Sequence, residues 1–195
     1  MQDLTDKELM LKYQQGDTAV MNELLRRYKN PVYHFVLRLS QDAAFAQDIA
    51  QEVFVRIHTH RAYYKPCGKF STWLFSIAHN LCISHLRKKK WHVLWPRSKE
   101  DPDKLVEFES SELSPKDVAE NNDFSAVLKR CIQGLPFLQK EALILREYQN
   151  LDYGEISKIL KKSLGAVKTL IHRARLNLKQ KLLPHFKEIA GGYDE

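Results

Sequence analysis

Apolar side chains recur every three or four residues along most of this chain, and short polar stretches interrupt the pattern. Such spacing is typical of helices with one buried face. Two capping boxes, Thr5 with Glu8 and Asp152 with Glu155, mark helix starts, and the Asn-Pro pair at 30–31 predicts a restart or kink. The pattern predicts helices over residues 5–16, 17–29, 32–39, 42–57, 71–89, 123–133, 137–148, 152–160 and 163–178.

The most informative stretch is 152–175, where two of these helices are joined by a short polar turn. Ser163 is placed to cap the second helix, and Val167, Ile171, Ala174 and Leu178 form its apolar stripe. A helix held by one face, with cations and hydrogen-bonding groups on the outer face, suits the major groove of DNA. The sequence therefore predicts contacts to duplex DNA through Lys168, Thr169, His172, Arg173 and Arg175.

Composition supports an all-α protein. The 195 residues are 44% apolar, with only 7 Gly and 7 Pro. Residues 95–122 lack a sustained period and are rich in Ser, Pro, Asp and Glu, which is typical of a flexible linker. We expect two small helical domains, residues 1–94 and 123–195, joined by this acidic linker.

The net charge of +7 is unevenly distributed. Residues 98–123 carry nine acids and three lysines, a net −6, so the remainder of the chain carries +13. Two basic stretches, 87–90 and 158–187, hold much of this excess. Basic surfaces of this kind attract polyanions, although a solvated basic face is an equally good reading of charge alone.

Three scattered cysteines, Cys67, Cys82 and Cys131, form no CxxC pair, so neither a disulfide framework nor a zinc ribbon is indicated. The first residues are too polar for a signal peptide, and no apolar run has the length that a membrane span requires. We expect a cytoplasmic protein in a reducing compartment, without membrane insertion of its own.

A second candidate surface interleaves aromatic rings with cations between residues 63 and 90. Unpaired bases stack on rings while cations follow the phosphates, so this composition suits a single-stranded nucleic acid. For any one ring, burial in the core is the commoner role. The predicted contacts to a melted strand are Tyr63, Tyr64, Lys65, Phe70, Trp73, Asn80, Arg87 and Lys88.

The predicted helix 42–57 carries Asp48, Gln51 and Glu52 on one side. Paired carboxylates can hold a metal or perform acid–base chemistry, but no further ligand is spaced nearby. A protein-docking patch is the better interpretation, because a basic partner offsets local like charge. We expect no catalytic residues, no metal and no cofactor.

Three segments together resemble the sigma factors of bacterial RNA polymerase, of the short extracytoplasmic-function type in the sigma-70 family. They are 48–56, 69–89 and 135–175, and their order and the intervening linker also agree. The resemblance implies a region 2-like bundle and a region 4-like helix-turn-helix domain. It also implies a promoter-specificity factor that binds core RNA polymerase, recognises −35 and −10 elements and promotes strand opening.

The resemblance assigns roles to the candidate residues. Asp48, Gln51, Glu52 and Phe54 would bind the polymerase clamp, the 63–90 surface would take the melted −10 strand, and the helix-turn-helix would read the −35 duplex. An anti-sigma factor is a further partner that many relatives have. Two departures stand out: Lys161 replaces a common turn Gly, and Thr169-Leu170 replaces a common Ser-Arg pair.

Two alternatives stay open at this point. A stand-alone helix-turn-helix regulator would bind DNA without polymerase. A nuclease using Asp48 and Glu52 would cleave DNA in a metal-dependent manner.

Overall fold

The computed structural model describes residues 4–93 and 124–191, and the side chains of 4–85 and 126–185. The regular elements in these ranges are all helical. None of these helices has an apolar stretch long enough to cross a bilayer. They are α1 (Asp6–Gln14), α2 (Val20–Ser40), α3 (Ala43–Thr59), the 3-10 turn η1 (Arg61–Tyr63), α4 (Phe70–Val93), α5 (Phe124–Gln133), α6 (Phe137–Glu147), α7 (Tyr153–Leu160) and α8 (Leu164–Gly191).

The predicted helix starts are confirmed where a side chain caps the backbone. Thr5 and Asp152 each open a capping box, with Glu8 and Glu155 as the reciprocal partners. Asp42 accepts the backbone N–H of Phe45 at the start of α3. These polar side chains satisfy donors that the first turn of a helix leaves unpaired.

Several predicted boundaries differ from the structure, and the largest difference is at α8, which continues to Gly191 instead of ending near residue 178. The helix does not restart at residues 30–31, because α2 runs without a break from Val20 to Ser40 with Pro31 inside it. Burial explains the continuity: Val32, Phe35 and Val36 are fully buried on the same face as Leu24, so packing outweighs the missing N–H of proline. The helix α4 begins at Phe70, so Ser71 lies in its first turn instead of capping it.

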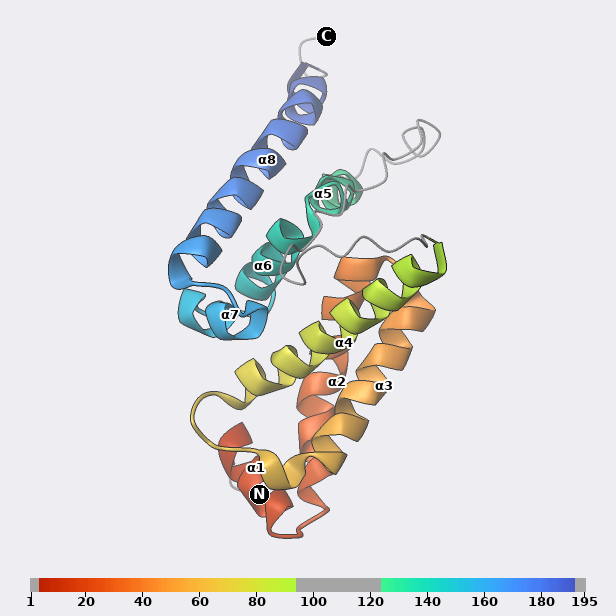
Figure 1. Ribbon diagram of the computed structural model, residues 1–195. Coiled ribbons are helices and arrows are strands. Elements are labelled where there is room, and N and C mark those ends of the chain that lie inside the picture. The colour runs from red at the N-terminus through yellow and green to blue at the C-terminus, as the bar shows by residue number, and fades with distance from the viewer. Residues whose placement is uncertain (1–3, 94–123, 192–195) are drawn as a thin grey trace, which may run out of the picture.

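In the N-terminal domain, α1–α4, the helices α2, α3 and α4 pack against one another, and α1 packs against α2 (Figure 1). All six predicted inner positions of α3 are buried. The rings of Phe35 and Phe75 meet edge to face with their centroids 5.3 Å apart. Such aromatic pairs add to the free energy gained by removing the two side chains from water.

The C-terminal domain, α5–α8, packs directly onto α2 and α4 (Figure 1). Buried residues of α6, α7 and α8 belong to the same apolar cluster as those of α2, α3 and α4. At the junction, His79 Nδ1 lies 2.7 Å from the Oε1 atom of Glu141, which is fully buried. Nearby, Gln133 donates to the carbonyl of Arg38 at 2.6 Å, and the Arg38 guanidinium covers the ring of Tyr148. We call this packing of the two domains the closed arrangement.

The three cysteines differ in their accessibility. Cys67 is exposed between η1 and α4, whereas Cys82 and Cys131 are buried. Burial raises the pKa of both buried thiols, and the nearby Glu141 carboxylate adds to this effect for Cys82. The reactive thiolate is therefore suppressed at two of the three positions.

We predict that one thiol per native chain reacts rapidly with a disulfide reagent near neutral pH, and that all three react in denaturant. Cys67→Ser removes the rapid phase, and the matched Cys131→Ser leaves it in place. Absorbance of the released thiol measures both. Rapid reaction of Cys82 or Cys131 in the native chain would contradict the packing described here.

Candidate nucleic-acid interface

The first half of α8 has a buried face and an open face. Val167, Ile171 and Ala174 are each no more than 1% exposed. Ser163 Oγ caps the start of the helix by accepting the N–H of Ala166 at 3.2 Å. The opposite side is exposed and presents Lys168, Thr169, His172 and Arg173. The helix-turn-helix predicted from the sequence is present. All four side chains are exposed, and the Thr169 hydroxyl donates to the carbonyl of Gly165 at 3.0 Å.

Arg175 has a different environment from these four residues. Its guanidinium donates to a carboxylate oxygen of Glu147, at the end of α6, at 2.7 Å. This hydrogen bond raises the pKa of Arg175. The side chain is therefore held toward α6 by one of its nitrogens.

The turn between α7 and α8 obtains its shape without glycine. Lys161 itself takes the left-handed conformation, with φ of 53° and ψ of 42°. Ser157 Oγ supports the turn by donating to the carbonyl of Lys162 at 2.6 Å. A left-handed backbone is unfavourable for residues with a Cβ, so the turn carries strain that a glycine would relieve.

The aromatic surface predicted for a melted strand is smaller in the structure. Tyr63 is 78% exposed, but Tyr64 and Phe70 are only 5% and 2% exposed. These two rings pack against Trp73, with centroids 5.0 and 6.0 Å from the indole, and Phe70 also meets Tyr28. Burial raises the pKa of the Tyr64 phenol. Tyr64 and Phe70 are therefore buried beside Trp73, and their contact with a melted strand stays a prediction.

The exposed remainder of this surface lies along the loop and one side of α4. Lys65 and Asn80 are exposed, and Trp73 is half-buried. Residues 73 and 80 are seven apart, so they lie on the same face of the helix. Arg87 and Lys88 lie within α4, but their side chains are outside the described residues.

One contact that shapes this surface was not predicted from the sequence. The side-chain amide of Gln14, at the end of α1, donates to the carbonyls of Arg61 and Tyr64 at 2.6 and 2.8 Å. These bonds fix the backbone on both sides of Tyr63. No local pattern marks them, because the partners are nearly fifty residues apart.

Lys69 and Thr72, also absent from the predicted site, contact the helix-turn-helix. The Lys69 ammonium and the Thr72 hydroxyl lie 3.1 and 3.2 Å from oxygens of the Glu155 carboxylate. Glu155 is at the start of α7 and is 8% exposed. One face of α4 is therefore covered by the C-terminal domain, while the face of Trp73 and Asn80 stays open.

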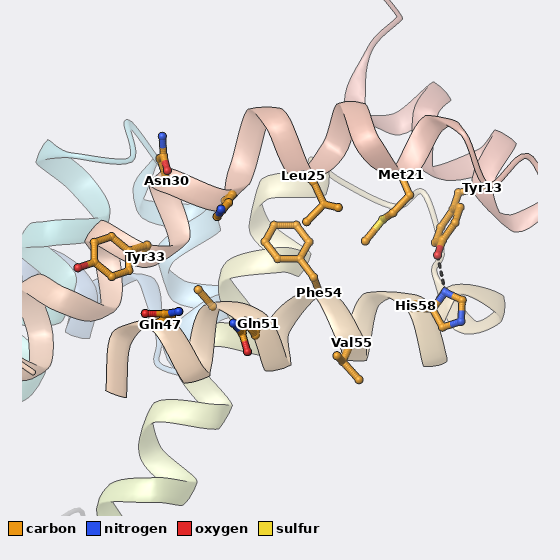
Figure 2. Close-up of a pocket in the computed structure, with 12 residues that line it drawn as sticks. Tyr13, Met21, Leu25, Asn30, Tyr33, Gln47, Gln51, Phe54, Val55 and His58 are labelled. Carbon is orange, nitrogen blue, oxygen red and sulfur yellow. Dashed lines mark hydrogen bonds between the residues drawn. The ribbon is translucent and has the colours of Figure 1, made fainter. Parts of the chain in front are cut away.

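A groove of about 800 Å³ runs between α2 and α3 (Figure 2). Phe54 points from α3 toward Leu25 and Met21 of α2, and Val55 is 54% exposed beside it. A hydrogen bond of 2.5 Å between Tyr13 Oη and His58 Nδ1 closes one end. The groove is mostly apolar, as are the grooves that bind the apolar face of an amphipathic helix.

Polar residues of α3 lie along this groove. Gln51 lines it, and Asp48, one turn before Glu52, is exposed. Glu52 accepts a hydrogen bond from Arg56 at 2.9 Å, so its charge is offset within the helix. Among residues 4–85 and 126–185, no group of three His, Cys, Asp or Glu side chains is placed to hold a metal ion.

Comparison with known proteins identifies the two domains. The family model "Sigma-70 region 2" matches residues 24–92, and "Sigma-70, region 4" matches residues 125–178. The RNA polymerase sigma-H factor of Pseudomonas aeruginosa is 29% identical over 194 residues, covering 94% of this chain and 96% of the relative. SigW of Bacillus subtilis, an ECF sigma factor, is 30% identical with 90% and 96% coverage. The ECF sigma-E factor of Escherichia coli K12 is also 30% identical, with 93% and 96% coverage.

Two solved structures share the fold. One is the sigma factor RpoE of Bartonella quintana in complex with the anti-sigma factor NepR, with a TM-score of 0.62 and 22% identity over 83% of this chain and 95% of that one. The other is CnrH in complex with the cytosolic domain of CnrY, with a TM-score of 0.64 and 17% identity over 91% of this chain and 96% of that one.

The conformation of Lys161 leads to a stability prediction. Lys161→Gly should raise the free energy of unfolding by up to about 1 kcal/mol, because relief of the left-handed strain exceeds the entropy of the added glycine. Lys158→Gly, at an exposed position inside α7, is the matched control and should cost about 1 kcal/mol. Urea unfolding followed by circular dichroism measures both. Equal destabilisation by the two variants would show that the turn is not strained.

Proposed function

Because this chain belongs to the sigma-70 family of bacterial RNA polymerase sigma factors, in its extracytoplasmic-function group, we propose that three of its surfaces divide the work of promoter recognition. The protein is a promoter-specificity factor. It binds core RNA polymerase, recognises −35 and −10 elements and promotes strand opening. Sigma factors are specificity factors and not enzymes, and we propose that this chain has no catalytic activity of its own and acts in the cytoplasm.

The proposal rests on the two sides of α8: its outer face is exposed, and its opposite face is a buried apolar stripe. We propose that Lys168, Thr169, His172 and Arg173 read the −35 duplex from the major groove. Cationic and hydrogen-bonding side chains match the base edges and phosphates displayed there. Because Arg175 is paired with Glu147, we assign it a secondary part in this contact.

The second surface takes the melted −10 strand. We propose that Tyr63 and Trp73 stack on unpaired bases, Lys65 follows a phosphate and Asn80 reads a base edge. Gln14 supports Tyr63 by holding the backbone around it. Stacking on an aromatic ring contributes about 1–3 kcal/mol per base and does not depend strongly on sequence.

The third surface is the groove between α2 and α3, which we propose as the docking site for the polymerase clamp. Phe54 and Val55 offer apolar contact, while Asp48, Gln51 and Glu52 supply polar and acidic groups beside it. This combination suits a helical segment with apolar and basic side chains. RpoE is solved in complex with the anti-sigma factor NepR, and CnrH in complex with the cytosolic domain of CnrY. We therefore include an anti-sigma factor among the proposed partners of this chain.

In vitro transcription with core polymerase on fragmented genomic DNA tests the proposed function, and the transcript starts identify the promoters. Transcripts that appear only when the chain is added are expected. Failure to bind core polymerase would instead favour the stand-alone helix-turn-helix regulator. Metal-dependent DNA cleavage lost in Asp48→Ala would favour the nuclease.

Arg173→Ala should weaken binding to the −35 duplex by about 1–3 kcal/mol, because a base or phosphate contact is lost. Binding to core polymerase should not change, since α8 lies away from the α2–α3 groove. Lys179→Ala, which removes an exposed cation farther along α8, is the matched control. Titration with the mapped promoter measures all three proteins, and an equal loss in the control would show that only overall charge matters.

Trp73 variants separate stacking from packing. Trp73→Leu keeps apolar contact with Tyr64 and Phe70 but has no aromatic face, whereas Trp73→Phe keeps a ring. We expect both to fold, and Trp73→Leu to lose about 1–3 kcal/mol of strand opening relative to Trp73→Phe. Permanganate footprinting of the melted region measures opening, and urea unfolding measures stability. Equal strand opening by the two variants would show that Trp73 contributes only to packing.

A further inference from the structure

The carboxylate of Glu155 performs two tasks in the closed arrangement. It accepts the backbone N–H of Asp152 at 2.9 Å and so completes the capping box of α7. The same carboxylate accepts from Lys69, which directly precedes α4, and from Thr72 in the first turn of α4. A capping box needs an acceptor oxygen, which glutamine supplies as well as glutamate. The negative charge is therefore dispensable for the cap, and its partner in the structure is the Lys69 ammonium.

Lys69 and Thr72 have the chemistry of a phosphate site. An ammonium just before the start of α4 and a hydroxyl in its first turn both donate to anionic oxygen, as such side chains do in many protein contacts to nucleic-acid backbones. They lie between the loop of Tyr63 and Lys65 and the half-buried Trp73, within the surface that takes the melted strand. In the closed arrangement a carboxylate occupies both donors.

The closed arrangement also conflicts with the geometry of a promoter. By their nominal positions, the centres of the −35 and −10 elements lie about 25 base pairs apart, which is roughly 85 Å along the duplex at 3.4 Å per base pair. In the structure α7 lies directly against α4. Binding both elements therefore requires the Glu155 contact to break.

We propose that Lys69 and Thr72 form a binding site for the phosphodiester backbone of the melted strand, and that the Glu155 carboxylate occupies this site as a phosphate mimic while the domains are closed. DNA and the closed arrangement then compete for the same two donors. This inference rests on the proposed function, because it extends the melted-strand surface. The α2–α3 groove lies outside the contact, so polymerase can dock on the closed chain before DNA displaces Glu155.

Binding of the free, full-length chain to a labelled single-stranded oligonucleotide of mixed sequence tests the proposal. Glu155→Gln keeps the cap and removes the charge, so affinity should rise about two- to fivefold, the range expected for one partly exposed ion pair. Asp17→Asn is the matched control, because it removes one exposed carboxylate charge and keeps a side-chain oxygen that can accept the N–H of Ala19. An equal gain in affinity in Asp17→Asn would show that only overall charge matters and would overturn the proposal.

A double-mutant cycle assigns the effect to Lys69. In a Lys69→Ala background, Glu155→Gln should not raise the affinity for the oligonucleotide further, because the Lys69 ammonium that Glu155→Gln would release is absent. Lys69→Ala alone should make the salt dependence of binding shallower by about 0.7 in log–log slope, the value for one phosphate of a single strand. If the two changes had independent, additive effects on affinity, the proposed competition between Glu155 and DNA for Lys69 would be overturned.

A distance measurement tests the opening itself. Cys67 and a cysteine introduced by Lys158→Cys carry spin labels on the two domains, while Cys82 and Cys131 are buried. The oligonucleotide should lengthen the separation, and Glu155→Gln should lengthen it without DNA. Binding at an unchanged short separation would overturn the proposal. A chain that opens in this way but directs no transcription would overturn the proposed function and leave the phosphate site standing.

Discussion

Helix α4 is shared between the two domains, and the rest of the structure depends on how its surface is divided. One face, with Leu74 and Ala78, completes the core of the N-terminal bundle. A second face, with Thr72 and His79, meets α6 and α7 of the other domain. The third, with Trp73 and Asn80, stays open. A helix packed on two sides tolerates few changes, because a rotation that improves one contact disturbs the other and also reorients the open face.

The junction between the domains contains polar groups that are costly to bury. Glu141 is fully buried, and its Oε2 has no hydrogen-bond partner among the described residues. Lys140 beside it is 8% exposed, and burial lowers the pKa of its ammonium. Separation of the domains returns these groups to water, which offsets part of the apolar contact that is lost. The junction therefore suits reversible closure better than permanent assembly.

Local chemistry made much of this fold predictable. The capping box at Asp152, the stripe on α8 and the buried face of α3 each follow from residues within a few turns of one another. The restart predicted at Pro31 is absent, because the burial of its neighbours, which is a tertiary effect, keeps α2 continuous. The sequence did not distinguish Tyr64 and Phe70 from the exposed Tyr63, since all three are aromatic residues in one stretch. The bonds from Gln14 and Glu155 join distant segments and leave no periodic signal.

Neighbouring residues at the end of α1 serve two different surfaces. Tyr13 closes the α2–α3 groove through His58, and Gln14 holds the loop that carries Tyr63. A partner in the groove that displaced α1 would therefore also move the loop that carries Tyr63, through one helical turn. Linkage would then require the reverse as well: a base stacked on Tyr63 would change the affinity of the groove for its partner by the same factor. The first helix would thus couple the proposed docking groove to the proposed melted-strand surface.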